Sequence, residues 1–204
     1  MIQLGIDEAG RGPVLGPLVM AGLVADEAGR RRLADLGVAD SKSFGSGAKA
    51  QAQRAKLAEV LQQEFPHRLL FFSPSEIDQA VKHKGLNRLE QQGARQILQS
   101  LSWEQAVLDG QTLFRPLANA CIKAVNKADR DFIVVAAASI LAKNARDQAL
   151  EELLAPFALE FGGGQGGGYP NPATLRFVQW HWQRFGSLPA CYRTSYQWKA
   201  VNLT

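Results

Sequence analysis

The chain has 204 residues, of which 46% are hydrophobic and 21% are charged, a balance typical of an ordinary globular domain. This composition excludes collagen-like, disordered and coiled-coil proteins, and no apolar run reaches the about 18 residues that a membrane-spanning helix needs. Lys and Arg number 23 against 19 Asp and Glu, a net charge of +4, which is weak evidence for a polyanionic partner. The two cysteines are too few for a disulfide framework, and no signal sequence is evident. We therefore expect a cytoplasmic protein without membrane association.

Hydrophobic periodicity predicts strands that alternate with helices. We expect strands at 2–6, 17–24, 68–72, 105–109 and 120–125. We expect helices at 48–64, 86–101, 132–157 and 172–184. Asn171 and Pro172 favour the start of the last helix, as N-cap and first helical residue. The alternation predicts an α/β fold.

One break in composition interrupts this pattern. Six glycines fall among the seven residues from Gly162 to Gly168, which indicates a flexible loop. We interpret it as a hinge within a single domain spanning 1–204, because the piece that follows is too short to hold a core alone. The expected division is a core at 1–161 and a C-terminal helical appendage at 169–204.

The C-terminal stretch is unusual in its side chains. From Phe161 to Thr204 there is no Asp or Glu, and the stretch carries three tyrosines and three of the four tryptophans. Aromatic rings between cations can grip nucleic acid by stacking and phosphate contacts. The alternative is that Trp180, Trp182 and Trp198 are core residues, and we favour it for any single ring because large aromatic side chains dominate protein cores.

Four carboxylates stand near the ends of predicted elements: Asp7 and Glu8 after the first strand, Asp109 after a later strand and Asp129 before the long helix. Adjacent residues of a strand point to opposite faces, so Asp7 and Glu8 converge only if the strand ends there. Clustered carboxylates repel one another, and two Mg²⁺ or Mn²⁺ ions would relieve the repulsion. Such an ion pair activates water and stabilises the leaving oxygen in phosphodiester hydrolysis. Each acid also has a structural interpretation, and Asp131 and Asp147 compete with Asp129 for the fourth position.

Other patterns are less informative. The Asp7–Arg11 pentapeptide recurs at Asp26–Arg30, but the second copy continues into the start of a charged surface helix, and we interpret it as coincidence. No Ser–His nucleophile pair is evident. The three histidines lack ligand spacing and are expected at the surface: His67, His83 and His181.

The segment from Gly5 to Pro13, with its Gly-Arg-Gly triplet, resembles the opening motif of the type 2 ribonucleases H, the ribonuclease HII family. Matches to further family motifs follow in order at 40–42, 109, 127–129, 137–147 and 168–170. The resemblance covers residues 5 to about 198. It implies a ribonuclease H-like fold, a mixed sheet flanked by helices with a helical C-terminal part.

The resemblance also implies a function. Members of the family cleave the RNA strand of RNA–DNA hybrids and cut at single ribonucleotides in duplex DNA, leaving 5′-phosphate and 3′-hydroxyl ends. It implies that the metal-binding catalytic acids are Asp7, Glu8, Asp109 and Asp129. The ten-residue distance to Ser139 selects Asp129 over Asp131.

Substrate contacts follow from the same motifs. Gly10, Arg11 and Gly12 would present backbone amides and a guanidinium to the nucleotide before the cut, and Tyr169 would stack on its ribose. Together they would sense the 2′-hydroxyl, which distinguishes RNA from DNA. Phosphate contacts are expected, by their chemistry, from Lys42, Lys143 and Arg146.

Three other functions compete with a monomeric hybrid nuclease. The sister family, ribonuclease HIII, has Lys where Arg11 stands and an extra N-terminal domain, which we do not expect here from the four residues before Gly5. A binding protein that lost catalysis would not need all four acids. A Holliday-junction resolvase of the same fold would lack the Gly-Arg-Gly segment and Tyr169.

Overall fold

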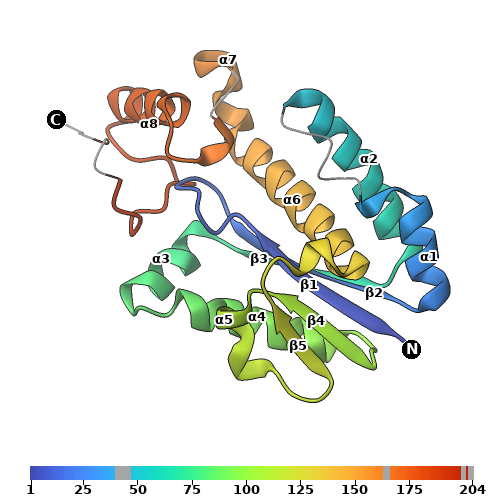
Figure 1. Cartoon of the computed structure of the whole chain (residues 1–204). Coiled ribbons are helices and arrows are strands. Elements are labelled where there is room, and N and C mark those ends of the chain that lie inside the picture. The colour runs from blue at the N-terminus through green and yellow to red at the C-terminus, as the bar shows by residue number, and fades with distance from the viewer. Residues whose placement is uncertain (40–46, 163–165, 199–200, 202–204) are drawn as a thin grey trace. The chain divides into compact units, whose positions relative to one another are not determined.

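The computed structural model describes residues 1–39, 47–162, 166–198 and 201. Its centre is a sheet of five strands in the order β3-β2-β1-β4-β5 (Figure 1). The strands are β1 (Gln3–Ala9), β2 (Leu18–Ala25), β3 (His67–Phe72), β4 (Gln105–Asp109) and β5 (Ile122–Val125). β1 is antiparallel to β2 and parallel to β4, which is parallel to β5. The predicted mixed sheet is confirmed.

The helices are α1 (Glu27–Asp35), α2 (Ala48–Glu64), α3 (Pro74–Lys82), α4 (Leu86–Ser100), α5 (Gln111–Phe114), α6 (Ile133–Leu154), α7 (Ala158–Phe161) and α8 (Pro172–Phe185). α1, α2 and α6 share one hydrophobic cluster with side chains of β1, β2 and β4, Leu23 of β2 among them. Gly22 faces the other way, and a Cβ there would lie 2.3 Å from Ile97 of α4. Helices therefore cover both faces of the sheet.

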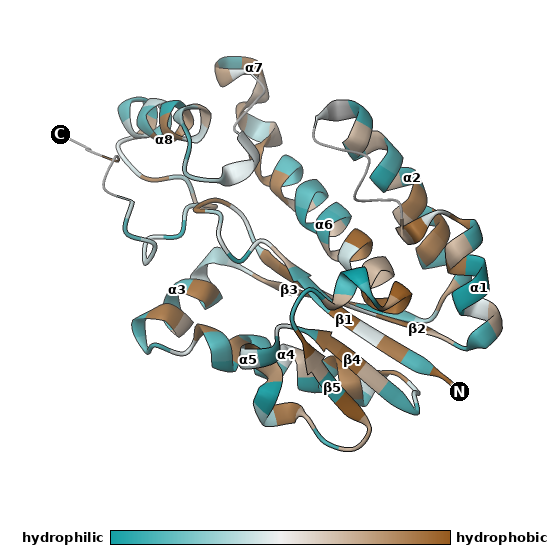
Figure 2. Ribbon diagram, viewed as in Figure 1, coloured by the Kyte–Doolittle hydropathy of each residue, from teal (hydrophilic) through white to brown (hydrophobic). Residues whose placement is uncertain are grey.

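Burial of apolar side chains accounts for this arrangement. Every residue of β2 is buried, as expected for a strand covered on both faces. Hydrophobic residues concentrate in the strands, as the brown segments of Figure 2 show. Within the described part of the chain, no helix is long and apolar enough to cross a membrane.

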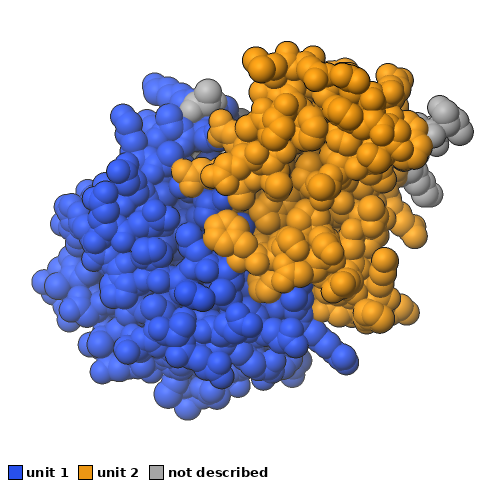
Figure 3. All heavy atoms as spheres, turned by 180° about the vertical axis from the view of Figure 1, so that it is seen from behind, with its two compact units in different colours: residues 1–9, 19–70, 87–145 blue, residues 10–18, 71–86, 146–204 orange. Residues whose placement is uncertain are grey.

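The chain divides into two compact units (Figure 3). The first comprises Met1–Ala9, Val19–Leu70 and Asn87–Ala145, and the second Gly10–Leu18, Phe71–Leu86 and Arg146–Thr204. The second unit has its own hydrophobic cluster, in which Val14 and Leu15 join residues of α6, α8 and the C-terminal segment. The expected division into 1–161 and 169–204 stays a prediction.

The sequence patterns located most elements but missed α3. Ser73 accepts the Glu76 N–H and Glu76 accepts the Ser73 N–H, a complete capping box with Pro74 at the helix start. The second copy of the pentapeptide is structural, because the Asp26 carboxylate caps α1 by accepting the N–H of Gly29.

The surface prediction for the histidines is wrong for His181. Its side chain is only 7% exposed, and its Nδ1 lies 2.7 Å from the carbonyl of Ser187. Trp180 packs within the same aromatic group, against Phe157, Phe161 and Phe177. Trp180 is therefore a partly buried residue packed against the core cluster of the second unit.

Candidate active site

The strand register brings the predicted acids of the first unit to one edge of the sheet. Ile6 of β1 pairs with Leu108 of β4, and the last residue of β4, Asp109, pairs with Val125 of β5. Asp7 follows Ile6, so it lies level with Asp109 at the carboxyl end of β4, and β1 itself continues to Ala9. This is the edge at which open α/β sheets bind ligands.

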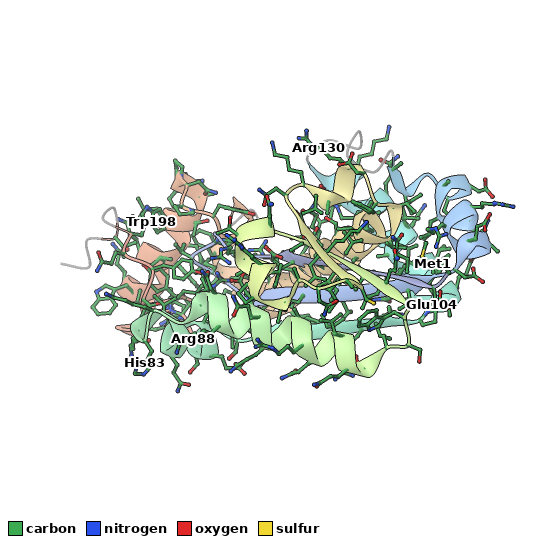
Figure 4. The ribbon with its side chains drawn as sticks, turned by 60° about the horizontal axis from the view of Figure 1, so that its bottom comes forward. Met1, His83, Arg88, Glu104, Arg130 and Trp198 are labelled. Atoms are coloured by element: carbon green, nitrogen blue, oxygen red, sulfur yellow. The ribbon has the colours of Figure 1, made fainter. Side chains whose placement is uncertain are left out.

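Contacts at the opposite edge help to set that register. The terminal ammonium of Met1 lies 3.8 Å from the Glu104 carboxylate, and the two residues lie close together in Figure 4. The Ile2 N–H also donates to Glu104 at 2.7 Å. These contacts hold the start of β1 beside the start of β4.

Asp7 is the buried member of the acid set, with 7% of its surface exposed. The pKa of Asp7 is raised from 3.8 to about 6, chiefly by burial and to a smaller extent by the nearby charge of Asp109. The Ser139 hydroxyl, the Glu8 N–H and the charge of Lys143 act in the opposite direction. Asp7 thus lies within electrostatic reach of Asp109 and of the α6 residues Ser139 and Lys143.

Gly5 allows α6 to approach Asp7 so closely. A Cβ at Gly5 would lie 2.3 Å from the backbone carbon of Val134 in α6, closer than any non-bonded contact allows. The bare glycine lets the helix lie directly on β1, with Ser139 one and a half turns further along the helix.

Two hydrogen bonds hold the loop that carries Asp129. Asp109 Oδ1 accepts the Ala128 N–H at 3.3 Å, and Asn126 Oδ1 accepts the Gln111 N–H at 2.8 Å. Asp129 is half-buried in a 3-10 turn, η3 (Ala128–Arg130), between β5 and α6. Arg130 points outward (Figure 4).

The first strand is longer than the predicted range of 2–6, and Asp7 and Glu8 lie within it and not after its end. β1 continues through Ala9, with Glu8 opposite Met20 and Ala9 opposite Val19 in the antiparallel pairing with β2. Among residues 1–39, 47–162, 166–198 and 201, no three His, Cys, Asp or Glu side chains form a group that could hold a metal ion as they are placed. The four-acid metal set therefore stays a prediction.

The donor chemistry nevertheless fits a hard cation. Carboxylate oxygens are the ligands that Mg²⁺ and Mn²⁺ prefer. The raised pKa of Asp7 shows that ionising this buried carboxyl beside Asp109 is unfavourable in the protein alone. A cation at this edge would remove that cost.

In the second unit the structure brings the Gly-Arg-Gly segment together with Tyr169. Gly10 has a φ of +93°, and a Cβ there would lie 2.5 Å from the Pro17 carbonyl oxygen, so only glycine fits. Gly12 and Tyr169 are exposed, and a Cβ on Gly12 would lie 3.8 Å from the Tyr169 ring.

The loop before Tyr169 is anchored to the same segment. The Gly168 carbonyl accepts the N–H groups of Val14 and Leu15 at 2.8 and 3.1 Å. The Arg146 guanidinium donates to the carbonyls of Leu15 and Gly167 at 3.3 and 2.6 Å. The glycine-rich stretch is therefore held in place where it reaches Tyr169.

The predicted phosphate contacts differ in exposure. Lys143 is exposed on α6. Arg146 is 4% exposed and its guanidinium has protein partners, so its phosphate contact stays a prediction that burial does not favour. The Asp40–Lys42 segment, and Lys42 with it, lies outside the described residues.

Comparison with known proteins decides the family, since the family model described as Ribonuclease HII matches residues 4–199. This chain belongs to the ribonuclease HII family. The Ribonuclease HII of Thermococcus sibiricus is 36% identical over 97% of this chain and 88% of its own length. The ribonuclease H2 structure from Pyrococcus horikoshii matches with a TM-score of 0.82 and 34% identity, covering 98% of this chain and 95% of that one.

A further structure, the PCNA:RNase HII complex from Archaeoglobus fulgidus, matches with a TM-score of 0.81 and 34% identity over 98% of this chain and 96% of that one. With the family match, these relatives show that this ribonuclease HII is a metal-dependent endoribonuclease of the ribonuclease H type.

Sequence reasoning missed the contribution of the C-terminal segment. Arg193 is fully buried, although its place in a basic, acid-free stretch suggested a nucleic-acid contact. Nothing in the pattern indicated which carbonyls would surround it.

Proposed function

We propose that this ribonuclease HII cleaves the RNA strand of RNA–DNA hybrids and incises 5′ to single ribonucleotides embedded in duplex DNA. The observation that carries the proposal is the register of β1 with β4, which puts the buried Asp7 level with Asp109. The second unit supports the ribonucleotide part, since it pairs Gly12 with an exposed Tyr169.

In this proposal Asp7, Glu8, Asp109 and Asp129 would hold two Mg²⁺ or Mn²⁺ ions. Such ions, when bound, supply an activated water and stabilise the charge on the leaving oxygen. The Glu8 N–H, which donates to Asp7 Oδ1 at 2.8 Å, would orient the Asp7 carboxylate. Hydrolysis would leave 5′-phosphate and 3′-hydroxyl ends, with no covalent intermediate.

Recognition of the ribose would come from the residues of the second unit, the segment from Gly10 to Gly12 and Tyr169. The N–H groups of the segment from Gly10 to Gly12 would meet the 2′-hydroxyl, and the Tyr169 ring would stack on the sugar. Lys143 would contact a phosphate, with Lys42 and Arg146 as further candidates. We propose a cytoplasmic monomer acting on nucleic acid.

The test is incision of duplex DNA that carries one ribonucleotide, with Mg²⁺ or Mn²⁺, followed by mapping of the cut. Wild type should cut 5′ to the ribonucleotide, and Arg11→Ala should lower the rate about tenfold or more, the effect of a charge-assisted contact. Arg31→Ala is the matched control, because Arg31 is exposed on α1 and pairs with Glu27.

Other outcomes would favour the alternatives. Cleavage of long hybrids alone would indicate a ribonuclease HIII-like activity without specificity for the junction. Binding without any cleavage would indicate a silent nucleic-acid-binding protein.

A further inference from the structure

Arg193 is a buried cation surrounded by main-chain carbonyls of the segment from Gly10 to Gly16. It is 0% exposed. Its Nη2 donates to the Gly10 carbonyl at 2.6 Å, its Nη1 to the Arg11 carbonyl at 3.3 Å and its Nε to the Gly16 carbonyl at 2.9 Å. Burial of a charge is costly unless it is well hydrogen-bonded, so this arginine fixes those three carbonyls firmly.

The segment around Arg193 is itself anchored. The Tyr196 hydroxyl donates to the Arg11 carbonyl at 2.7 Å, and its ring centroid lies 5.1 Å from the Arg193 guanidinium carbon. Asp78 of α3 accepts four hydrogen bonds, at 2.5 to 2.9 Å, from the N–H and hydroxyl groups of residues 194–195. Every one of these groups belongs to the second unit.

Peptide planarity converts this anchoring into an orientation of donors. In a trans peptide the C=O of one residue and the N–H of the next are coplanar and point in opposite directions. Arg193 and Tyr196 hold the carbonyls of Gly10 and Arg11, so the N–H groups of Arg11 and Gly12 are turned away from the guanidinium. These are two of the N–H groups assigned above to the 2′-hydroxyl.

We propose that Arg193, supported by Tyr196 and Asp78, is a positioning residue that orients these N–H groups for the 2′-hydroxyl of the substrate. The inference rests on the function proposed above. It gives the C-terminal segment a role in telling ribose from deoxyribose, through the loop and without contact with the substrate.

The test compares kcat/KM on duplex DNA with a single ribonucleotide against kcat/KM on a long RNA–DNA hybrid. A single ribonucleotide offers one 2′-hydroxyl, whereas a hybrid offers many sites and an A-like shape. The ratio of the two values is unaffected by partial unfolding, because a lower active fraction scales both equally. Tyr196→Phe removes one donor to Arg11, and Arg193→Lys replaces the planar fork by a single ammonium.

The expected result is a fall of the ratio by about fivefold in Tyr196→Phe, the effect of one hydrogen bond, and a larger fall in Arg193→Lys. Arg184→Gln is the matched control, because Arg184 is exposed on α8 and pairs with Glu160, and its ratio should equal that of wild type. If Arg193→Lys does not fold, Tyr196→Phe alone decides.

An unchanged ratio in folded Tyr196→Phe would overturn the inference. If wild type cuts single ribonucleotides and Arg11→Ala does not, that outcome leaves the proposed function intact. If wild type does not cut a single ribonucleotide at all, the proposed function itself fails.

Discussion

Asp7→Asn should stabilise the metal-free protein at neutral and alkaline pH while abolishing its activity. The pKa of Asp7 is raised from 3.8 to about 6, first by burial. A raised pKa means that the folded state disfavours the ionised form of Asp7. The resulting loss in the free energy of unfolding is absent below pH 3.8, grows as the pH rises to 6, and is complete above that. At 1.36 kcal/mol for each pH unit, the shift corresponds to about 3 kcal/mol.

Asparagine keeps the shape of the side chain without its charge. We therefore expect the free energy of unfolding of Asp7→Asn to exceed that of wild type by up to about 3 kcal/mol at pH 8 in EDTA, and to match it near pH 4. For a chain of this length the melting temperature would rise by up to roughly 6–12 °C. Urea unfolding at both pH values measures the difference.

Metal addition should reverse the order. Mg²⁺ bound only to the native state stabilises wild type by RT ln(1 + [Mg²⁺]/Kd), and Asp7→Asn should gain much less. Asp131→Asn, at an exposed position, is the control. Equal stability of Asp7→Asn and wild type at pH 8 in EDTA would refute the argument that an uncompensated buried charge is held at this edge.

Three other substitutions have defined consequences. Gly5→Ala places a methyl group 2.3 Å from the Val134 backbone and should cost about 3 kcal/mol or more in urea unfolding; a near-neutral effect would mean that α6 can move off β1. In Gly10→Ala the new methyl group would clash with the Pro17 carbonyl, and the residue has a positive φ. This variant should lose more single-ribonucleotide incision than hybrid cleavage. Equal losses of the two activities would show that this loop does not sense the ribose. Burial alone would raise the pKa of Asp78, but its hydrogen bonds hold that pKa below the ordinary value. Asp78→Asn should therefore lower the melting temperature at pH 7, and the difference from wild type should shrink as acid protonates the wild-type carboxyl. A difference in melting temperature that does not depend on pH would contradict this.

The sequence predicted that the acids stand near the ends of elements and cluster, but not the strand pairing and register that relate Asp7 to Asp109. Asp7 and Asp109 stand near the ends of apolar strands, and local patterns suffice to place each there. Which strands pair, and in which register, depends on contacts between distant segments and on the packing of α6 over Gly5. The pattern also could not show that β1 continues past Glu8, because that depends on pairing with β2.

The role of Arg193 was beyond sequence reasoning for a related reason. A basic residue in an acid-free tail suggests contact with a polyanion. Its actual partners are the main-chain carbonyls of Gly10 and Gly16, which are 183 and 177 residues away in the sequence. Main-chain carbonyls have no sequence signature, so a buried arginine that binds them cannot be told from an exposed one by composition.

The helix α3 was missed although its start was visible. It has nine residues, too few for a clear period of apolar positions. Its capping box, from Ser73 to Glu76, was the local signal that would have revealed it. This omission bears on the proposed role of Arg193, since α3 carries Asp78.

The most direct test of the account is hybrid cleavage by wild type, Asp129→Asn and Asp131→Asn at saturating Mg²⁺. The two acids are two residues apart, but only Asp129 lies in the turn that is joined to Asp109 through Ala128. The account predicts a loss of about a hundredfold or more in kcat for Asp129→Asn, as for removal of a group that stabilises the transition state, and a kcat for Asp131→Asn close to that of wild type. Full activity of Asp129→Asn, or equal losses in both variants, would contradict the assignment of the catalytic acids to the ends of β1, β4 and β5.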